Sequence, residues 1–113
     1  MARYLFMVRS DPNSTACAMS PEEREETIGK YMAWVKSLEH GGHLLGGEKL
    51  RDKQGRVLRR KEKLVVTDGP YTETKEIVGG FWLIQADSYD HAVEIADGLP
   101  FGRGALEIRE IEE

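Results

Sequence analysis

Hydrophobic positions along the chain fall into short runs with the periodicity of strands. Residues 3–10 and 80–86 are apolar on both alternating faces, which is typical of strands covered on both sides. Residues 105–111 alternate between apolar and charged side chains, so we expect a strand with one solvent-facing side. Residues 43–50 also favour a strand, and their Gly46-Gly47 pair indicates a bulge or a close approach between backbones.

Two longer segments have the spacing of amphipathic helices. The first begins after an N-cap at Ser20, with proline at the first helical position, and ends at Gly41-Gly42. The second follows a cap at Asp87 or Ser88 and runs through Asp97. The positions expected to face the core are Ile28, Tyr31, Met32, Val35 and Leu38 in the first helix, and Ala92, Val93, Ile95, Ala96 and Leu99 near the second. Trp34 lies outside the first stripe.

The order of these segments predicts a known topology. Residues 51–67 form an expected inserted hairpin, with apolar arms at 57–58 and 64–66. The remaining order is strand, helix, strand, strand, helix, strand, which is the βαββαβ pattern of an α+β, ferredoxin-like fold. At 113 residues the chain fits one domain, 1–113. The first and third core strands are central in this topology, in agreement with their apolar faces.

The predicted fold leaves one face of the sheet without a cover. Two helices cover only one side of a four-stranded sheet, so Tyr4, Phe6, Trp82 and their neighbours cannot all be buried by this chain alone. A large exposed apolar surface usually marks an association site, and a symmetric homodimer is the commonest solution. We therefore predict two sheets packed face to face across a two-fold axis.

Composition and charge exclude several classes of partner. The net charge of −4 and the pI of about 5.4 disfavour nucleic acid, and the basic run at residues 56–63 has no aromatic residues for base stacking. Cys17 is the only cysteine, which excludes an internal disulfide and fits a reducing cytoplasm. Residues 1–8 are too short for a signal peptide, and no apolar run reaches membrane-spanning length. We expect a cytoplasmic protein with no membrane partner.

Residues 68–76, DGPYTETKE, resemble the DGPFAETKE-like signature of the DGPF subgroup of the YCII-related family. Tyr71 replaces the usual phenylalanine and Thr72 the usual alanine. The similarity covers nearly the whole chain and includes residues 46–48, Leu50, 78–81 and 106–109.

The resemblance implies a dimeric α+β barrel with a cleft for a small molecule or a reaction. Some YCII relatives are enzymes of aromatic degradation that use a histidine and an aspartate, but this chain has no histidine in its first helix before His40, and Tyr31 is the nearest suitable polar ring. Relatives of the subgroup also occur beside or fused to extracytoplasmic-function sigma factors. The family implies no established reaction.

The signature supplies most candidate functional residues. Asp68 either closes an Asx turn or points its carboxylate into the dimer cleft, where desolvation raises the pKa of a carboxyl group toward that of a useful base. The mixed charges that follow are either solvated or bind an anionic substrate. Glu48 either lines the cleft or is an ordinary exposed glutamate. Our candidate catalytic residues are Asp68, Lys75, Glu76 and Tyr31, and our candidates for substrate binding are Glu48, Tyr71 and Glu73.

Two functional hypotheses and one structural reading remain open from the sequence. In the structural reading, the signature only stiffens the inserted hairpin and docks it on the partner subunit. In the first functional hypothesis, the protein is an acid-base enzyme of lyase, isomerase or hydrolase type, in which Asp68 is the base and Lys75 or Tyr31 steadies negative charge on a small aromatic or carbonyl compound. In the second, it is a non-catalytic dimeric module that works with a sigma factor. The chain has no phosphate-binding glycine loop, and its histidines lack the spacing of a metal site, so we expect no cofactor and no metal.

Overall fold

The structure is a computed structural model, and it describes residues 1–10, 20–51, 54–69, 77–101 and 104–113. The elements are β1 (Ala2–Ser10), α1 (Pro21–His40), β2 (Leu44–Lys49), β3 (Arg56–Arg60), β4 (Leu64–Asp68), β5 (Ile77–Ala86), α2 (Tyr89–Asp97) and β6 (Ala105–Glu110). These elements confirm the predicted α+β, ferredoxin-like order with its inserted hairpin. No helix within the described residues is both long and apolar enough to span a membrane.

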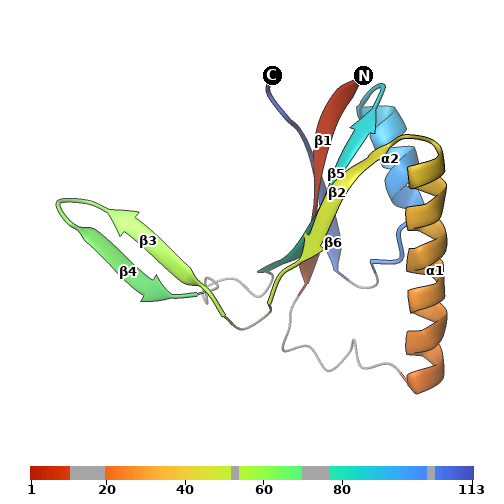
Figure 1. Ribbon diagram of the computed structural model, residues 1–113. Coiled ribbons are helices and arrows are strands. Elements are labelled where there is room, and N and C mark those ends of the chain that lie inside the picture. Colours follow the sequence, from red (N-terminus) through yellow and green to blue (C-terminus); the bar gives the residue numbers. More distant parts are fainter. Residues whose placement is uncertain (11–19, 52–53, 70–76, 102–103) are drawn as a thin grey trace.

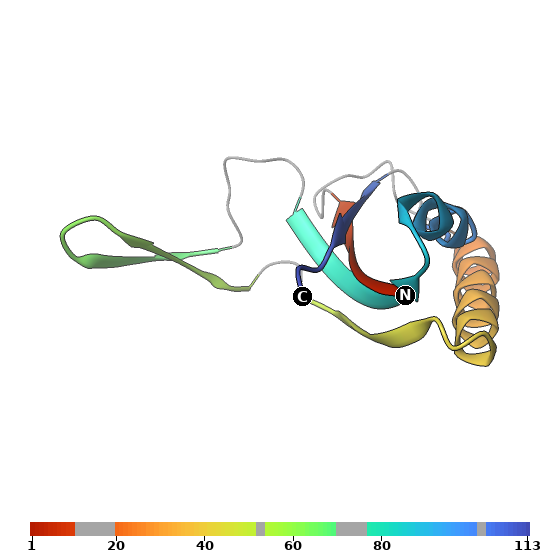
Figure 2. The same ribbon diagram turned by 90° about the horizontal axis from the view of Figure 1, so that it is seen from above.

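Four strands form one antiparallel sheet, and both helices lie on one side of it (Figures 1 and 2). The strand order is β2-β5-β1-β6, so β5 and β1 are central, as their apolar sequences predicted. A bulge between Leu44 and Gly46 interrupts the β2–β5 register, and another between Val8 and Arg9 interrupts the β1–β5 register. The sheet therefore has one helix-covered face and one open face.

Local hydrogen bonds explain where the two helices begin and end. The Glu23 backbone N–H donates to Ser20 Oγ at 3.1 Å, and the His91 N–H donates to Ser88 Oγ at the same distance. Each hydroxyl satisfies a backbone donor that the first helical turn leaves unpaired. Gly41 and Gly98 cap the C-terminal ends, in agreement with the sequence.

The buried side of α1 differs from the predicted stripe. Trp34 is only 7% exposed and Leu38 is also buried, whereas Ile28 and Met32 are 52% and 60% exposed. The Trp34 ring packs edge to face on Trp82, with 5.1 Å between ring centroids. Periodicity alone centred the stripe on the aliphatic residues, but the contacts with the sheet and α2 rotate the buried side toward Trp34.

The two faces of the sheet also carry different residues from those we expected. Tyr4 and Phe6 are fully buried under the helices, and Trp82 packs against the same core. The expectation that Tyr4 and Phe6 face the uncovered side was wrong, whereas Trp82 and the neighbours of these residues on β1 and β5 are only half-buried by this chain. Strand alternation places Leu5, Met7, Phe81 and Leu83 on the opposite, open face.

The β3–β4 hairpin forms a separate two-stranded sheet that projects from the side of the main sheet opposite the helices (Figures 1 and 2). This projection makes the molecule extended. Its radius of gyration is 16.0 Å, whereas a compact domain of this length is expected near ~13 Å.

Candidate functional site

The open face of the main sheet has an apolar centre made by its two middle strands. Leu5 of β1 lies opposite Leu83 of β5, and Met7 lies opposite Phe81. All four side chains are half-buried, and directly paired residues of antiparallel strands project from the same face. The result is a contiguous apolar floor, which we call the floor.

Charged residues border the floor on both sides. Glu48 of edge strand β2 lies opposite Phe81, and Glu107 of edge strand β6 lies opposite Met7. Arg9 Nε donates to Glu107 Oε1 at 3.0 Å, which fixes that carboxylate, while Glu48 is exposed. The face therefore combines an apolar centre with an exposed carboxylate on one edge and an arginine–glutamate pair on the other.

Among the sequence candidates that the structure describes, Glu48 lies on this face. Its position follows from the β2–β5 register, in which the bulge after Leu44 sets the faces of the residues that follow. Gly46 lies opposite Leu83 on the open face, and Gly47 lies opposite Trp82 on the helix side. The glycine pair therefore precedes a carboxylate at the edge of the floor.

Asp68 lies at the end of β4, at the base of the hairpin. It is paired with Arg56 across the two strands, and Arg56 Nη1 is 3.5 Å from Asp68 Oδ1. The Asp68 side chain is 93% exposed. In a single subunit this carboxylate is fully hydrated, so the desolvation required of a catalytic base has to come from a ligand or from another chain.

Four sequence candidates lie outside the described residues. They are Tyr71, Glu73, Lys75 and Glu76. The signature is therefore described only at its first two residues, Asp68 and Gly69.

Tyr31 lies away from the open face. It is on α1 and packs against the core on the helix-covered side of the sheet. Burial raises the pKa of its phenol, which stabilises the neutral form. Within one subunit, the sheet separates Tyr31 from Glu48, so these two candidates do not share a site.

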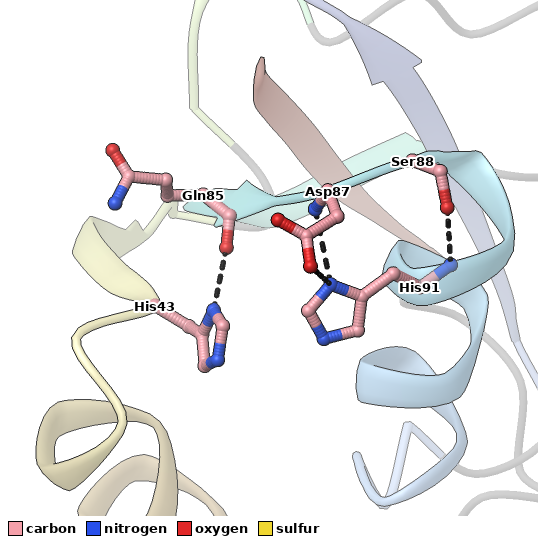
Figure 3. Close-up of polar contacts among 5 residues, drawn as sticks. All are labelled: His43, Gln85, Asp87, Ser88 and His91. Atoms are coloured by element: carbon pink, nitrogen blue, oxygen red, sulfur yellow. Dashed lines mark hydrogen bonds and ion pairs between the residues drawn. The ribbon is translucent and has the colours of Figure 1, made fainter. Parts of the chain in front are cut away.

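A histidine pair connects the turn after α1 to the first turn of α2 (Figure 3). The rings of His43 and His91 meet edge to face, with 5.1 Å between centroids. His43 Nδ1 donates to the Gln85 carbonyl at 2.8 Å, and His91 Nδ1 accepts from the Asp87 backbone N–H at 3.0 Å. These bonds leave a lone pair on His43 Nε2 and a proton on His91 Nε2 when both rings are neutral.

Sequence reasoning missed this pair because His43 and His91 are far apart in the chain. A partial signal was present, since Asp87 precedes His91 by one helical turn and its Oδ2 lies 3.5 Å from His91 Nδ1. The described parts of the chain contain no group of three residues able to hold a metal ion. We interpret the pair as a clasp between the α1–β2 turn and the start of α2.

Comparison with known families connects this fold to a wider group of proteins. A family model described as the YCII-related domain matches residues 2–113. The chain belongs to the YCII-related family. A search among curated proteins found no match.

Proposed function

We propose that this YCII-related protein is a homodimer that binds a small organic molecule between the open sheet faces of its two subunits. The observation that carries the proposal is the floor, an apolar surface on the two central strands with charged residues at both edges. A two-layer domain leaves such a face in contact with water unless a third layer covers it. Pairing of two floors across a two-fold axis gives that cover to both subunits at once.

The residues around the floor indicate the class of ligand. Phe81 and Met7 offer an aromatic and a polarizable surface, and Glu48 offers a hydrogen-bond acceptor beside them. These groups suit a flat, small aromatic or carbonyl compound that carries a polar substituent. The Arg9–Glu107 ion pair lies at the opposite edge of the floor.

The proposal also includes acid-base chemistry on the bound molecule. Asp68 is the base, and Lys75 of the same signature steadies the negative charge that forms on the substrate. Asp68 is hydrated in one subunit, so this role requires that ligand binding or dimer formation covers its carboxylate.

The assembly is tested by analytical ultracentrifugation at micromolar concentration. We expect the wild type to sediment as a dimer and Leu83→Asp to sediment as a monomer, because the substitution places a charge in the centre of the floor. Val93→Asp is the matched control, since Val93 is an exposed aliphatic residue of α2. Circular dichroism verifies that both variants are folded. A monomeric wild type would disprove the proposal.

Ligand binding and turnover are tested separately. A thermal-shift screen of aromatic acids and small carbonyl compounds is expected to give ligands that stabilise the wild type and stabilise Glu48→Gln less. With such a ligand, Asp68→Asn is expected to bind but to lose turnover, and the exposed Asp97→Asn serves as control. Unchanged turnover in Asp68→Asn would remove the base from the proposal and leave the binding site intact.

A further inference from the structure

The projecting β3–β4 hairpin, residues 56–68, is the largest feature that the proposed ligand site does not explain. We call it the arm. In the described structure, β3 and β4 form ladder pairs only with each other, and Gly69 N–H continues the ladder by donating to Gly55 O at 2.9 Å. An isolated two-stranded hairpin is marginally stable in water. The arm therefore needs a surface to pack on.

One face of the arm is exposed and has an aliphatic centre, with the Arg56–Asp68 pair at its base and Arg60 near its tip. The register places Leu58 opposite Val66, and Leu64 extends the same face toward the tip. Leu58 and Val66 are 57% and 53% exposed, and Leu64 is exposed too. Contiguous aliphatic side chains on a projecting element indicate a surface for association. We call these three residues the arm face.

The charge of the arm selects the kind of surface that it fits. Residues 56–68 contain five basic and two acidic side chains, a formal charge of +3, while the whole chain carries −4. The rest of the chain therefore carries −7. Opposite potentials attract two surfaces and orient them. We call the rest of the chain outside residues 56–68 the body, and the acidic body of a second copy is the surface of opposite sign.

The direction and length of the arm agree with this occupant. The arm extends on the open side of the sheet, away from the helices of its own subunit, in both views (Figures 1 and 2). Its strands have five residues each, which corresponds to about 16 Å. Sheets packed face to face are ~10 Å apart, so the arm is long enough to pass the sheet of a docked partner.

We propose that the arm docks on a second copy of this chain and buries the arm face against it. The inference rests on the face-to-face dimer proposed above and adds a second contact to each half of it. Under two-fold symmetry each subunit gives one arm and receives one. The dimer is then held by two separate surfaces, the floor at the centre and the arm at the periphery.

Two adjacent valines provide a matched test. Val66 belongs to the arm face, whereas Val65 projects from the opposite side of the same strand and is 49% exposed. Sedimentation equilibrium is expected to show that Val66→Ser raises the dimer dissociation constant at least ~10-fold and that Val65→Ser changes it less than ~2-fold. Equal effects of the two substitutions, including no effect, would overturn the inference.

Cross-linking identifies the occupant directly. In a Cys17→Ser background, a short thiol-reactive photo-cross-linker on Leu64→Cys is expected to give a product of twice the chain mass. Mixing of labelled and unlabelled subunits verifies that the link joins two chains. Cross-links only within one chain would overturn the inference. It would also be overturned if arm variants had the dimer dissociation constant of the wild type but lost binding to a DNA duplex.

The failure of the arm and the failure of the dimer are distinguishable. A wild type that sediments as a monomer removes both proposals. A wild type that is dimeric and is dissociated by Leu83→Asp, but not weakened by Val66→Ser, keeps the floor contact and removes the arm contact.

Discussion

At the scale of single residues, Trp34 connects three elements of the fold. Its Nε1–H donates to the Ile95 carbonyl of α2 at 2.8 Å, and its ring packs on Trp82 of β5. A Cβ atom added at Gly98 would lie 3.1 Å from Trp34 Cδ1, so the ring also fills the space at the end of α2. One side chain of α1 therefore contacts both the other helix and the sheet and fixes their relative positions.

Replacement of Trp34 by phenylalanine is expected to lower the free energy of unfolding by about 1–3 kcal/mol, through the lost hydrogen bond and the lost volume. Urea denaturation followed by far-UV circular dichroism measures this change. Met32→Ala is the control, since Met32 is largely exposed, and it should alter the free energy by less than ~0.5 kcal/mol. Similar effects of the two variants would restore the stripe expected from periodicity.

Two tyrosines, the buried Tyr4 and the half-buried Tyr31, lead to a prediction about alkaline pH. Burial raises the pKa of Tyr31, and burial together with the Glu110 carboxylate raises that of Tyr4. Below the unfolded pKa of about 10 both states keep the phenol protonated. Above it the unfolded chain loses the proton first, so native stability falls as pH rises through the folded pKa. Tyr31→Phe should flatten the decline of the urea midpoint between pH 9 and 11, and an unchanged slope would contradict this.

Residue-level prediction from the sequence succeeded where a local rule decides the outcome. Ser20, Ser88 and Gly41 cap helices because their chemistry acts within one turn. The roles of Trp34 and of the His43–His91 clasp depend on contacts between distant segments, which periodicity does not contain. Tyr31 is a candidate as the polar ring nearest the histidine position of the relatives, and Glu48 is a candidate because it follows two glycines on a strand. The sheet that separates them is a tertiary feature that neither signal contains.

At the scale of elements, edge strand β2 shows how two neighbouring glycines have different functions. A Cβ atom added at Gly47 would lie 2.5 Å from Trp82 Cε3 and 2.7 Å from the Phe81 carbonyl oxygen. A Cβ atom at Gly46 would meet nothing within 4 Å. Gly47 therefore permits β2 to lie against the central strand, whereas Gly46 follows the bulge and faces the open side.

Gly47→Ala is expected to cost about 1–3 kcal/mol of unfolding free energy, because the new methyl group overlaps a backbone oxygen and the Trp82 ring. Gly46→Ala is the adjacent control, and its effect should stay within ~0.5 kcal/mol. Chemical denaturation of both variants at low protein concentration measures the difference. If the two alanines cost the same, close packing at Gly47 is not what fixes β2.

The sequence predicted the strand β2 but not the separate roles of its two glycines. Gly46-Gly47 indicated either a bulge or a close approach, and the structure has both, a register shift just before Gly46 and a close contact at Gly47. The sheet shows a similar limit of sequence-based prediction. Apolar residues on both faces identified β1 and β5 as central strands, but this pattern does not distinguish the two faces, so it did not predict which face the helices cover.

At the scale of the whole molecule, the chain consists of a helix-covered sheet and an arm that extends from the open side. β2 and β5, which precede and follow the arm in the chain, are already neighbours in the sheet, and the Leu50 N–H donates to the Gly79 carbonyl at 2.9 Å. The arm is therefore an insertion between two paired strands, and the fold of the body does not depend on it topologically.

Removal of the insertion tests this division of the molecule. Replacement of residues 52–76 by a four-residue linker rich in asparagine and glycine is expected to leave the body folded, with the near-UV circular dichroism of the Trp34–Trp82 pair preserved. The same variant should dissociate at least as readily as Val66→Ser, because the complete arm is absent, and should lose turnover with Asp68 and Lys75. A control that replaces only residues 61–63 by Asn-Gly keeps both strands and should remain dimeric. An unfolded deletion variant would mean that the arm belongs to the core of the fold and not to its assembly.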